Sequence, residues 1–266
     1  MKNLIIIPTP IGNLSDLSPN MVQALSDVDV LLCESISNAR KLYQHIDQPL
    51  PKLIRYWQKT ENKVTDSLES LPGENIGLTS DAGMPGISDP GYWICKAWHE
   101  KKWPVRVVAG PCAVPMAIAA SGIPAENFQF VGFLPTTSEK LQKRLEEIKK
   151  SGQASVVYES PRRIVALCQA IEIIFGEDHL VFVAKELTKK HETYYRGSVG
   201  SVKETLLSSE PKGEFLMVIS RVKCQDNWQP ATEVLSAYLS ISDCAEAVAK
   251  IYSVSRSVVY QFLLQK

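Results

Sequence analysis

The stretch Ile76-Gly-Leu-Thr-Ser-Asp-Ala-Gly-Met-Pro-Gly-Ile-Ser-Asp-Pro-Gly91 decides the fold class of this chain. It opens with a short apolar run, Ile76–Thr79, which is typical of a buried strand. Twelve small or turn-forming residues follow, and an amphipathic stretch begins at Pro90. In open α/β sheets, ligands bind outside the carboxyl ends of strands, where glycine lets the backbone approach them closely. The stretch therefore predicts a strand, a binding loop and a helix.

Two other apolar runs end in similar loops. Pro8–Asn13 follows a predicted strand at Leu4–Pro8, and Ala109–Ala113 follows a predicted strand at Val105–Val108. A single loop of this kind would be an ordinary strand-to-helix turn. Three of them in one half of the chain favour a binding site.

The same alternation continues along the chain and predicts an α/β protein with largely parallel sheets. Further strands are expected at Asp29–Glu34, Phe130–Phe133, Ser155–Glu159, Leu180–Glu186, Tyr194–Gly197 and Phe215–Arg221. Helices are expected at Pro19–Asp27, Ala39–Ile46, Pro90–Lys101, Ala113–Ser121, Ser138–Lys150 and Arg162–Phe175.

Clusters of Gly and Pro between Gly110 and Pro124 predict a domain boundary. We expect an α/β domain over residues 1–115, a second over 116–222 and a helical extension over 223–266. In the extension, Ser242 or Asp243 is expected to cap a helix through Ile251, and Ser255 a second helix over Arg256–Leu264. This pair resembles a helix-turn-helix, which often binds nucleic acid, although a small packing appendage fits equally well.

Composition restricts the function classes. The 266 residues are 45% apolar and 22% charged, with formal net charge zero, so composition gives no support to a nucleic-acid substrate. No run approaches the roughly 18 apolar residues of a membrane span, and the first apolar run is too short for a signal peptide. A cytoplasmic protein without membrane contact is expected.

The cysteines are irregularly spaced, with no CxxC pair and no Cys/His cluster of the kind that binds zinc. We therefore expect reduced thiols and no metal site. The six cysteines are Cys33, Cys95, Cys112, Cys168, Cys224 and Cys244.

The three loops contain neither a GxGxxG nor a GxxxxGK[ST] motif, so the usual dinucleotide and nucleoside-triphosphate sites are not indicated. They also lack Lys and Arg. A neutral or cationic small ligand suits such loops better than a polyphosphate.

Several short strings occur together and in order. They are Pro8–Asn13, Ser80–Gly91, Gly110–Ala113, Tyr158-Glu159-Ser160-Pro161, Glu186-Leu187-Thr188-Lys189 and Lys212-Gly213-Glu214-Phe215. Their combination resembles the tetrapyrrole-methylase superfamily and, within it, the ribosomal RNA small-subunit methyltransferase I family. The resemblance runs from Leu4 to about Arg221, and the tail resembles the helical extension of that family.

The resemblance implies two α/β domains with a cleft between them, a small C-terminal helical extension and a homodimer. It also implies S-adenosyl-L-methionine as methyl donor and 2′-O-methylation of a cytidine ribose in the 16S rRNA of the 30S subunit. The donor-binding residues it implies are Pro10, Asp81, Ala82, Gly83, Pro85, Ser88, Asp89, Gly110, Pro111, Ala113 and Gly213. Carboxylate neighbours suit a sulfonium, and loop N–H groups suit the carboxylate of methionine.

A ribose hydroxyl is a poor nucleophile and profits from a nearby base. Glu34, Glu159 and Glu186 lie at or near predicted strand ends and are the catalytic candidates, although Glu159 and Glu186 fit a loop-holding role slightly better. The candidate RNA-binding residues are Arg40, Arg162, Arg163, Lys189, Lys190, Arg196 and Arg256. A solvated charged face is an equal alternative for them.

The chain departs from the family pattern after its second predicted strand. Cys33–Ser37 reads Cys-Glu-Ser-Ile-Ser where the family has Cys-Glu-Asp-Thr-Arg, so an acidic and a basic side chain are missing. This leaves open a diverged paralogue. The alternatives are a methyltransferase of the superfamily that acts on a tetrapyrrole or another small acceptor, and a non-catalytic RNA- or ribosome-binding protein.

Overall fold

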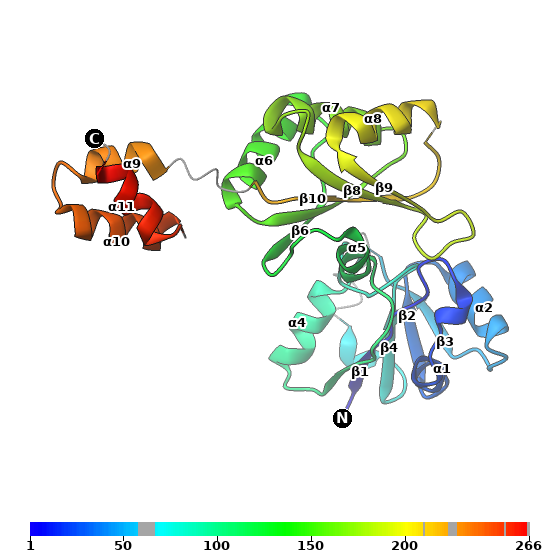
Figure 1. Ribbon diagram of the computed structural model, residues 1–266. Coiled ribbons are helices and arrows are strands. Elements are labelled where there is room, and N and C mark those ends of the chain that lie inside the picture. Colours follow the sequence, from blue (N-terminus) through cyan, green and yellow to red (C-terminus); the bar gives the residue numbers. More distant parts are fainter. Residues whose placement is uncertain (58–66, 210, 223–227, 253, 265–266) are drawn as a thin grey trace.

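The computed structural model describes residues 1–57, 67–209, 211–222, 228–252 and 254–264. These residues form two five-stranded sheets, each with its own helices, and a group of helices at the C-terminus (Figure 1). The prediction of two α/β units with a helical extension is confirmed.

The first sheet is wholly parallel, in the order β3-β2-β4-β1-β5. Its strands are β1 (Asn3–Ile6), β2 (Val30–Cys33), β3 (Lys52–Arg55), β4 (Asn75–Thr79) and β5 (Val105–Val107). Its helices are α1 (Pro19–Ser26), α2 (Ile36–His45) and α4 (Tyr92–Glu100), with 3₁₀ turns at Leu14–Asp16 and Leu68–Ser70. Strand β3 was not predicted.

Both faces of this sheet are buried. In β1 and just beyond it, Ile5 and Ile7 join the core under α1 and α2, whereas Leu4 and Ile6 join the core that contains Trp98 of α4. A strand buried on both faces is apolar throughout, which explains the Leu-Ile-Ile-Ile run.

Helix α2 begins at Ile36, three residues before the predicted start. The reason is a side-chain cap, since the Oγ of Ser35 accepts a hydrogen bond from the N–H of Asn38 (3.4 Å). The cap sets the N-terminus of α2 at the carboxyl end of β2.

The second sheet corrects the prediction of largely parallel sheets. Its order is β6-β7-β10-β8-β9, and only the β6–β7 pair is parallel. Its strands are β6 (Phe128–Phe133), β7 (Ala154–Glu159), β8 (Leu180–Lys185), β9 (Thr193–Ser198) and β10 (Phe215–Ile219). The last strand inserts antiparallel between β7 and β8, and a short loop turns β8 back into β9, which an antiparallel pair allows.

Helices cover both faces of the second sheet. They are α5 (Ala113–Ser121), α6 (Ser138–Ser151), α7 (Ile164–Phe175) and α8 (Val199–Ser208), of which α8 was not predicted. The last three bury one face, whereas α5 lies on the other, between the two sheets (Figure 1). Val114 and Ala117 of α5 share a core with Leu216 and Val218 of β10. The predicted domain boundary at residues 115/116 lies within this helix, and we propose that the boundary lies before it.

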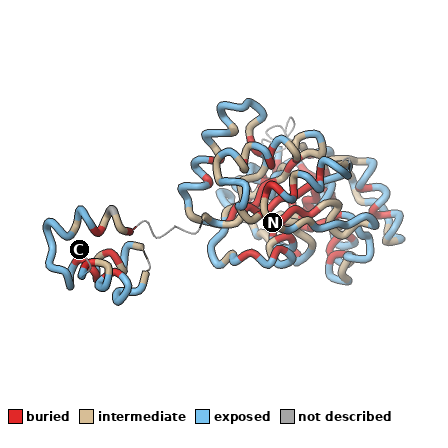
Figure 2. The backbone as a smooth tube through the Cα atoms, turned by 45° about the horizontal axis from the view of Figure 1, so that its top comes forward, coloured by how far each residue is buried: buried red, intermediate tan, exposed pale blue. Residues whose placement is uncertain are grey.

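The tail has its own small core. Its helices are α9 (Trp228–Leu235), which was not predicted, α10 (Ile241–Tyr252) and α11 (Arg256–Leu264). Its buried residues include Trp228, Val248 and Val259. Figure 2 marks buried positions along the helices of the tail. The cap of α10 is Ser240 rather than Ser242 or Asp243, because the Oγ of Ser240 accepts from the N–H of Asp243 (3.2 Å).

Five of the cysteines are free thiols, and Cys224 lies outside the described residues. Cys33, Cys168 and Cys244 are buried, whereas Cys95 and Cys112 are half-buried. Among the described helices, none has the length and apolar character needed to cross a membrane.

Candidate functional site

The loops after β1 and β4 are joined into one unit. Thr9 and Gly83 exchange two backbone hydrogen bonds of 2.9 Å, and the hydroxyl of Thr9 donates to the carbonyl oxygen of Ser80 (3.1 Å). Because β1 and β4 are parallel neighbours, their carboxyl ends meet at one edge of the sheet. This meeting of loops fits the binding site that the sequence predicts at the ends of the strands, and which residues bind a ligand there stays a prediction.

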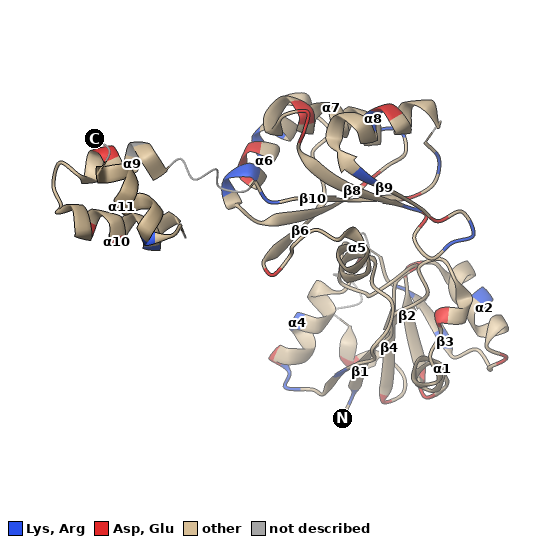
Figure 3. Cartoon of the chain, viewed as in Figure 1, with Lys and Arg blue, Asp and Glu red and all other residues tan. Residues whose placement is uncertain are grey.

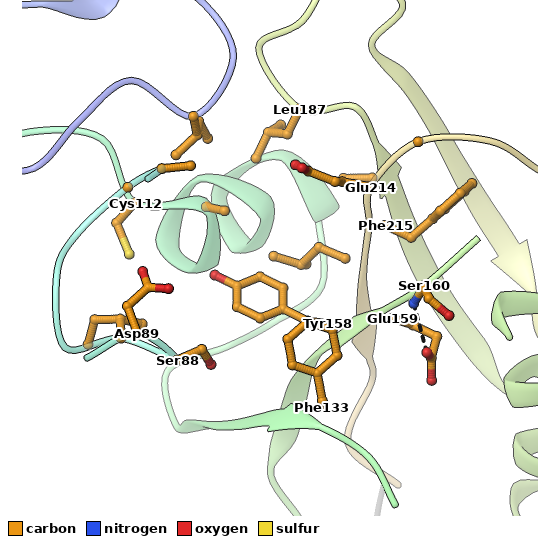
Figure 4. Close-up of a pocket in the computed structure, with 18 of the residues that line it drawn as sticks. Ser88, Asp89, Cys112, Phe133, Tyr158, Glu159, Ser160, Leu187, Glu214 and Phe215 are labelled. Atoms are coloured by element: carbon orange, nitrogen blue, oxygen red, sulfur yellow. Dashed lines mark hydrogen bonds between the residues drawn. The ribbon is translucent and has the colours of Figure 1, made fainter. Parts of the chain in front are cut away.

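A cavity of about 410 Å³ lies between the two domains (Figure 4). This volume is typical of small-ligand sites. The first domain and the chain after β5 supply Ile11, Ala82, Gly83, Met84, Ile87, Ser88, Asp89, Cys112 and Ala113. The second domain supplies Phe133, Tyr158, Glu159, Ser160, Pro161, Ala184, Leu187, Gly213, Glu214, Phe215 and Leu216. None of the described residues that line the cavity is basic.

The structure places most of the predicted donor-binding residues at this cavity or next to it. Ala82, Gly83, Ser88, Asp89, Ala113 and Gly213 line it. Pro10 and Asp81 line a neighbouring cavity of about 240 Å³. Pro85, Gly110 and Pro111 line neither.

Two of the glycines that line the cavity have backbone conformations that residues other than glycine rarely adopt. Gly83 has φ +84° and Gly213 has φ +94°. A Cβ atom on Gly213 would lie 2.6 Å from the Cδ of Glu186, and one on Gly83 would lie 3.2 Å from the Cγ2 of Ile11. Glycine therefore lets the backbone form the wall of the cavity at both places.

The first-domain end of the cavity is acidic. Burial and the negative charges of Glu34 and Asp81 raise the pKa of Asp89 to about 6, although a hydrogen bond with Ser80 opposes the rise. The N–H of Ser35 donates to an oxygen of Asp81 (3.1 Å) and fixes that carboxylate at the head of α2. A cationic ligand would be favoured here because it offsets the repulsion among these groups.

The second-domain side is apolar and aromatic. Tyr158 is half-buried, and burial, followed by the nearby Cys112 and the charges of Asp89 and Glu214, raises its pKa to about 12. Its hydroxyl therefore stays protonated at neutral pH and points towards the Asp89 side of the cavity (Figure 4).

Two of the three catalytic candidates are held in local contacts. Glu159 is buried, and one of its carboxylate oxygens accepts from the N–H of Ser160 (2.7 Å; Figure 4). The other oxygen lies 3.4 Å from the Nη2 of Arg163. Glu186 accepts from the N–H of Glu214 (2.7 Å) and from the Nζ of Lys189 (3.0 Å).

The hydrogen bonds to Glu186 outweigh burial and hold the pKa of its carboxyl below the usual value. Glu34, the third candidate, follows β2 and does not line the larger cavity, which it influences by its charge on Asp89. These contacts fit the loop-holding role for Glu159 and Glu186, and a catalytic role for any of the three stays a prediction.

Four of the predicted RNA-binding cations make intramolecular contacts, and one of these four, Arg256, donates to the hydroxyl of Ser242 (2.9 Å). Arg163 donates to the carbonyl oxygens of Leu134 and Pro135, and Arg196 donates to Ser121 (2.8 Å) and Gly122 (3.2 Å). Lys189 lies 3.0 Å from both Glu186 and Glu214.

Arg40, Arg162, Lys190 and Arg256 are exposed, and so is Arg196. Lys and Arg are spread over both domains and the tail (Figure 3). Contact between these residues and RNA stays a prediction.

Among the described residues, no group of three or more His, Cys, Asp or Glu is placed to hold a metal ion. The absence of a metal site stays a prediction.

Sequence reasoning did not select several residues of the cavity wall, notably Phe133, Tyr158, Leu187 and Phe215. Tyr158 stands in a string that identified the family, so its position at the end of a strand was an available signal. Phe133 carried no such signal, because it reaches the cavity only through an irregularity of β6.

Comparisons with known proteins agree with this geometry. The family model of tetrapyrrole (corrin/porphyrin) methylases matches residues 3–203. The chain is 31% identical to a ribosomal RNA small subunit methyltransferase I of Synechocystis sp., over 100% of this chain and 98% of that one. It is 32% identical to the protein of that name from Escherichia coli O157:H7, over 99% and 95%.

Among solved structures, the chain resembles a uroporphyrin-III C-methyltransferase from Thermus thermophilus complexed with S-adenyl homocysteine. The TM-score is 0.54 at 15% identity, over 82% of this chain and 97% of that one. At this identity the likeness shows the fold alone.

Proposed function

The chain belongs to the tetrapyrrole methylase family and, within it, to the ribosomal RNA small subunit methyltransferase I family, and from this premise we propose that it 2′-O-methylates a cytidine ribose in 16S rRNA. It is an S-adenosylmethionine-dependent methyltransferase. The observation that carries the proposal is near-complete coverage by relatives of this one name. The tetrapyrrole acceptor and the non-catalytic alternative gain no comparable support.

The larger cavity fits the donor. S-adenosylmethionine supplies a methyl group on a positively charged sulfonium. The cavity is large enough for a small ligand, it has an acidic end, and no described lining residue is basic. We propose that Ala82, Gly83, Ser88, Asp89, Ala113 and Gly213 hold the donor, with the backbone at Gly83 and Gly213 forming the walls where a side chain would intrude.

The hydroxyl that receives the methyl group must lose a proton, and we propose that Asp89 accepts it on a carboxylate oxygen. The described lining residues include three carboxylates. Glu159 pairs with Arg163 and Glu214 with Lys189, whereas Asp89 forms no ion pair with a described residue. A base with a pKa near neutrality is well matched to a reaction at neutral pH.

Methyl transfer to purified subunits tests the function. We expect label from methyl-labelled S-adenosylmethionine to enter 30S subunits prepared from a strain that lacks the gene. Nucleoside analysis should recover the label as 2′-O-methylcytidine. The 50S subunits serve as the control substrate. Absence of label in 30S subunits, with normal donor binding by calorimetry, would contradict the proposed acceptor.

From the same family membership we also propose how the protein contacts RNA, how it assembles and in which compartment it acts. The exposed Arg40, Arg162, Lys190 and Arg256 are the predicted cations best placed to meet RNA phosphates. We propose a homodimer that acts in the cytoplasm, where 30S subunits are found. Sedimentation analysis of the purified protein tests the dimer.

A further inference from the structure

Strand β6 contains a bulge that redirects one aromatic side chain. Its pairing with β7 matches Phe130 to Val156 and Phe133 to Tyr158, with a register shift between Phe130 and Gly132. Three residues of β6 thus span the distance that two residues span on β7. Gly132, at φ +71°, accommodates the irregularity.

The bulge changes the face on which Phe133 lies. In a regular strand, residues three apart lie on opposite faces. Here Phe130 and Phe133 both contact the ring of Tyr158, at centroid distances of 5.2 and 5.6 Å, and Val131 packs into the core on the opposite face. Bulges are over-represented next to active sites, where they aim a side chain.

Phe133 is exposed at the rim of the cavity. It is 64% exposed, whereas Tyr158 beside it is half-buried. Ile87 (39% exposed) is also an exposed apolar residue of the cavity wall, but among the described aromatic residues that line the cavity only Phe133 is exposed. An exposed ring at the mouth of a cavity, backed by a second ring, offers a flat apolar face to a ligand that enters there.

The ring lies towards the acidic end of the cavity. A Cβ atom on Gly132, the residue before Phe133, would lie 3.5 Å from the Oγ of Ser88, which precedes Asp89 in the long loop. Figure 4 shows Phe133 on the side of Ser88 and at the opposite end of the view from Leu187. A group stacked on Phe133 would therefore lie near the carboxylate proposed to accept the proton.

We propose that Phe133 stacks on the base of the nucleotide that receives the methyl group. The inference rests on the proposed function and assigns an acceptor-binding residue to that same site. Proteins that recognise unpaired RNA stack its bases on aromatic side chains. Phe133 would hold the base at the rim while the ribose of the same nucleotide lies towards Asp89, and Tyr158 supports the ring from behind.

Substitution of Phe133 by an aromatic and by an aliphatic residue tests the stacking. Phe133→Tyr keeps a flat ring, and Phe133→Leu keeps an apolar side chain without one. We expect Phe133→Leu to lower kcat/KM for 30S subunits by about 10- to 100-fold, since one base stacked on an aromatic residue contributes to that extent. Phe133→Tyr should stay within about threefold of the native protein, which is at most about half of the logarithmic loss expected for leucine.

Phe128→Leu is the matched control, because Phe128 is an exposed phenylalanine (44%) at the other end of β6 and does not line the cavity. It should leave kcat/KM unchanged. Binding of S-adenosylhomocysteine, measured by calorimetry, should be the same in all four proteins, and thermal unfolding checks that each variant is folded.

Three outcomes would overturn the inference. Equal activity of Phe133→Leu and the native protein would show that no base stacks on Phe133 during the reaction. A weakened affinity of folded Phe133→Leu for S-adenosylhomocysteine would place the ring in the donor site instead. A native protein that binds S-adenosylhomocysteine but methylates no 30S subunits would overturn the proposed function itself, and with it the acceptor assigned to Phe133.

Discussion

The two walls of the central cavity are built in different ways. The first domain contributes backbone, small side chains and negative charge, from loops after β1 and β4 that are bonded to each other. The second domain contributes aromatic and apolar side chains. Its loop after β8 is held by the Glu186–Lys189–Glu214 contacts. From this difference we propose that the first wall recognises charge and carries the chemistry, whereas the second wall recognises flat groups and fixes their position.

The largest expected effect belongs to the charge of the first wall. Asp89→Asn removes the proposed proton acceptor at nearly constant shape, so we expect kcat to fall by about 100-fold or more. In the native protein, kcat/KM should rise as pH increases through about 6, because Asp89 ionises there. A pH–rate profile from pH 5 to 8 measures this, and Asp89→Asn should lack the rise. An identical acidic limb in the variant would show that another group accepts the proton.

The stability of the protein should respond to Asp89 in the opposite direction. A carboxyl group whose pKa is raised in the folded state disfavours ionisation there, so its contribution to stability decreases as pH rises from about 4 through 6. At pH 7, Asp89→Asn should raise the free energy of unfolding of the ligand-free protein by about 1 kcal/mol, allowing for solvent screening of a partly exposed group. Urea unfolding at pH 4 and pH 7 tests the sign, since the gain should vanish at pH 4.

A second test of the first wall changes its shape. Gly83→Val places a branched side chain at φ +84° on the cavity wall, and donor affinity should fall by about 100-fold or more because the new atoms occupy the site. Gly86→Val is the matched control. Gly86 has nearly the same φ, +83°, and a Cβ atom there meets nothing within 4 Å.

The backbone strain is therefore shared by the two variants, and only the intrusion into the cavity differs. Calorimetry with S-adenosylhomocysteine compares them, with thermal unfolding as the check on folding. If both variants bind equally weakly, strain in the long loop rather than blockage explains the loss, and the backbone wall at Gly83 loses its support.

The same contrast explains how far the sequence could predict this site. The first wall follows from a local rule, because small residues after parallel strands meet at one sheet edge, and the loop Ser80–Gly91 was selected on that basis. Ala82, Gly83 and Asp89 within this loop were named because the resemblance to the family implies them. The second wall depends on contacts between distant segments. Nothing local signals that β10 inserts between β7 and β8, or that one extra residue in β6 turns Phe133 to the cavity.

The basic residues show the same limit. Arg163 and Arg196 were candidates for RNA phosphates because their sequence neighbourhoods are basic. Their actual partners are carbonyl oxygens at Pro135 and Ser121, far away in the chain. A charged side chain that holds a loop and one that binds a ligand can stand in the same local sequence pattern. Only the folded structure shows which of the two roles a residue has.

The smallest expected effect comes from the support of the second wall. Glu186→Gln keeps an oxygen that accepts from the N–H of Glu214 but loses the charge opposite Lys189. If Glu186 only holds the loop, its loss should cost about 0.5–1 kcal/mol of stability and raise the Kd for S-adenosylhomocysteine by about two- to fivefold. Glu172→Gln is the control, since Glu172 forms a comparably covered ion pair with Lys203 (2.6 Å) and does not line the cavity.

The effect of Glu186→Gln on kcat, compared with its effect on the affinity for the donor, decides the role of Glu186. A positioning residue should change donor affinity and leave kcat within a few-fold, whereas a proton acceptor should lower kcat by 100-fold or more at unchanged donor affinity. A lowered kcat at unchanged donor affinity would reverse the roles of the two walls, because the proton acceptor would then lie on the wall that we assign to positioning. The contacts of Glu186 with two partners of its own domain lead us to expect the first.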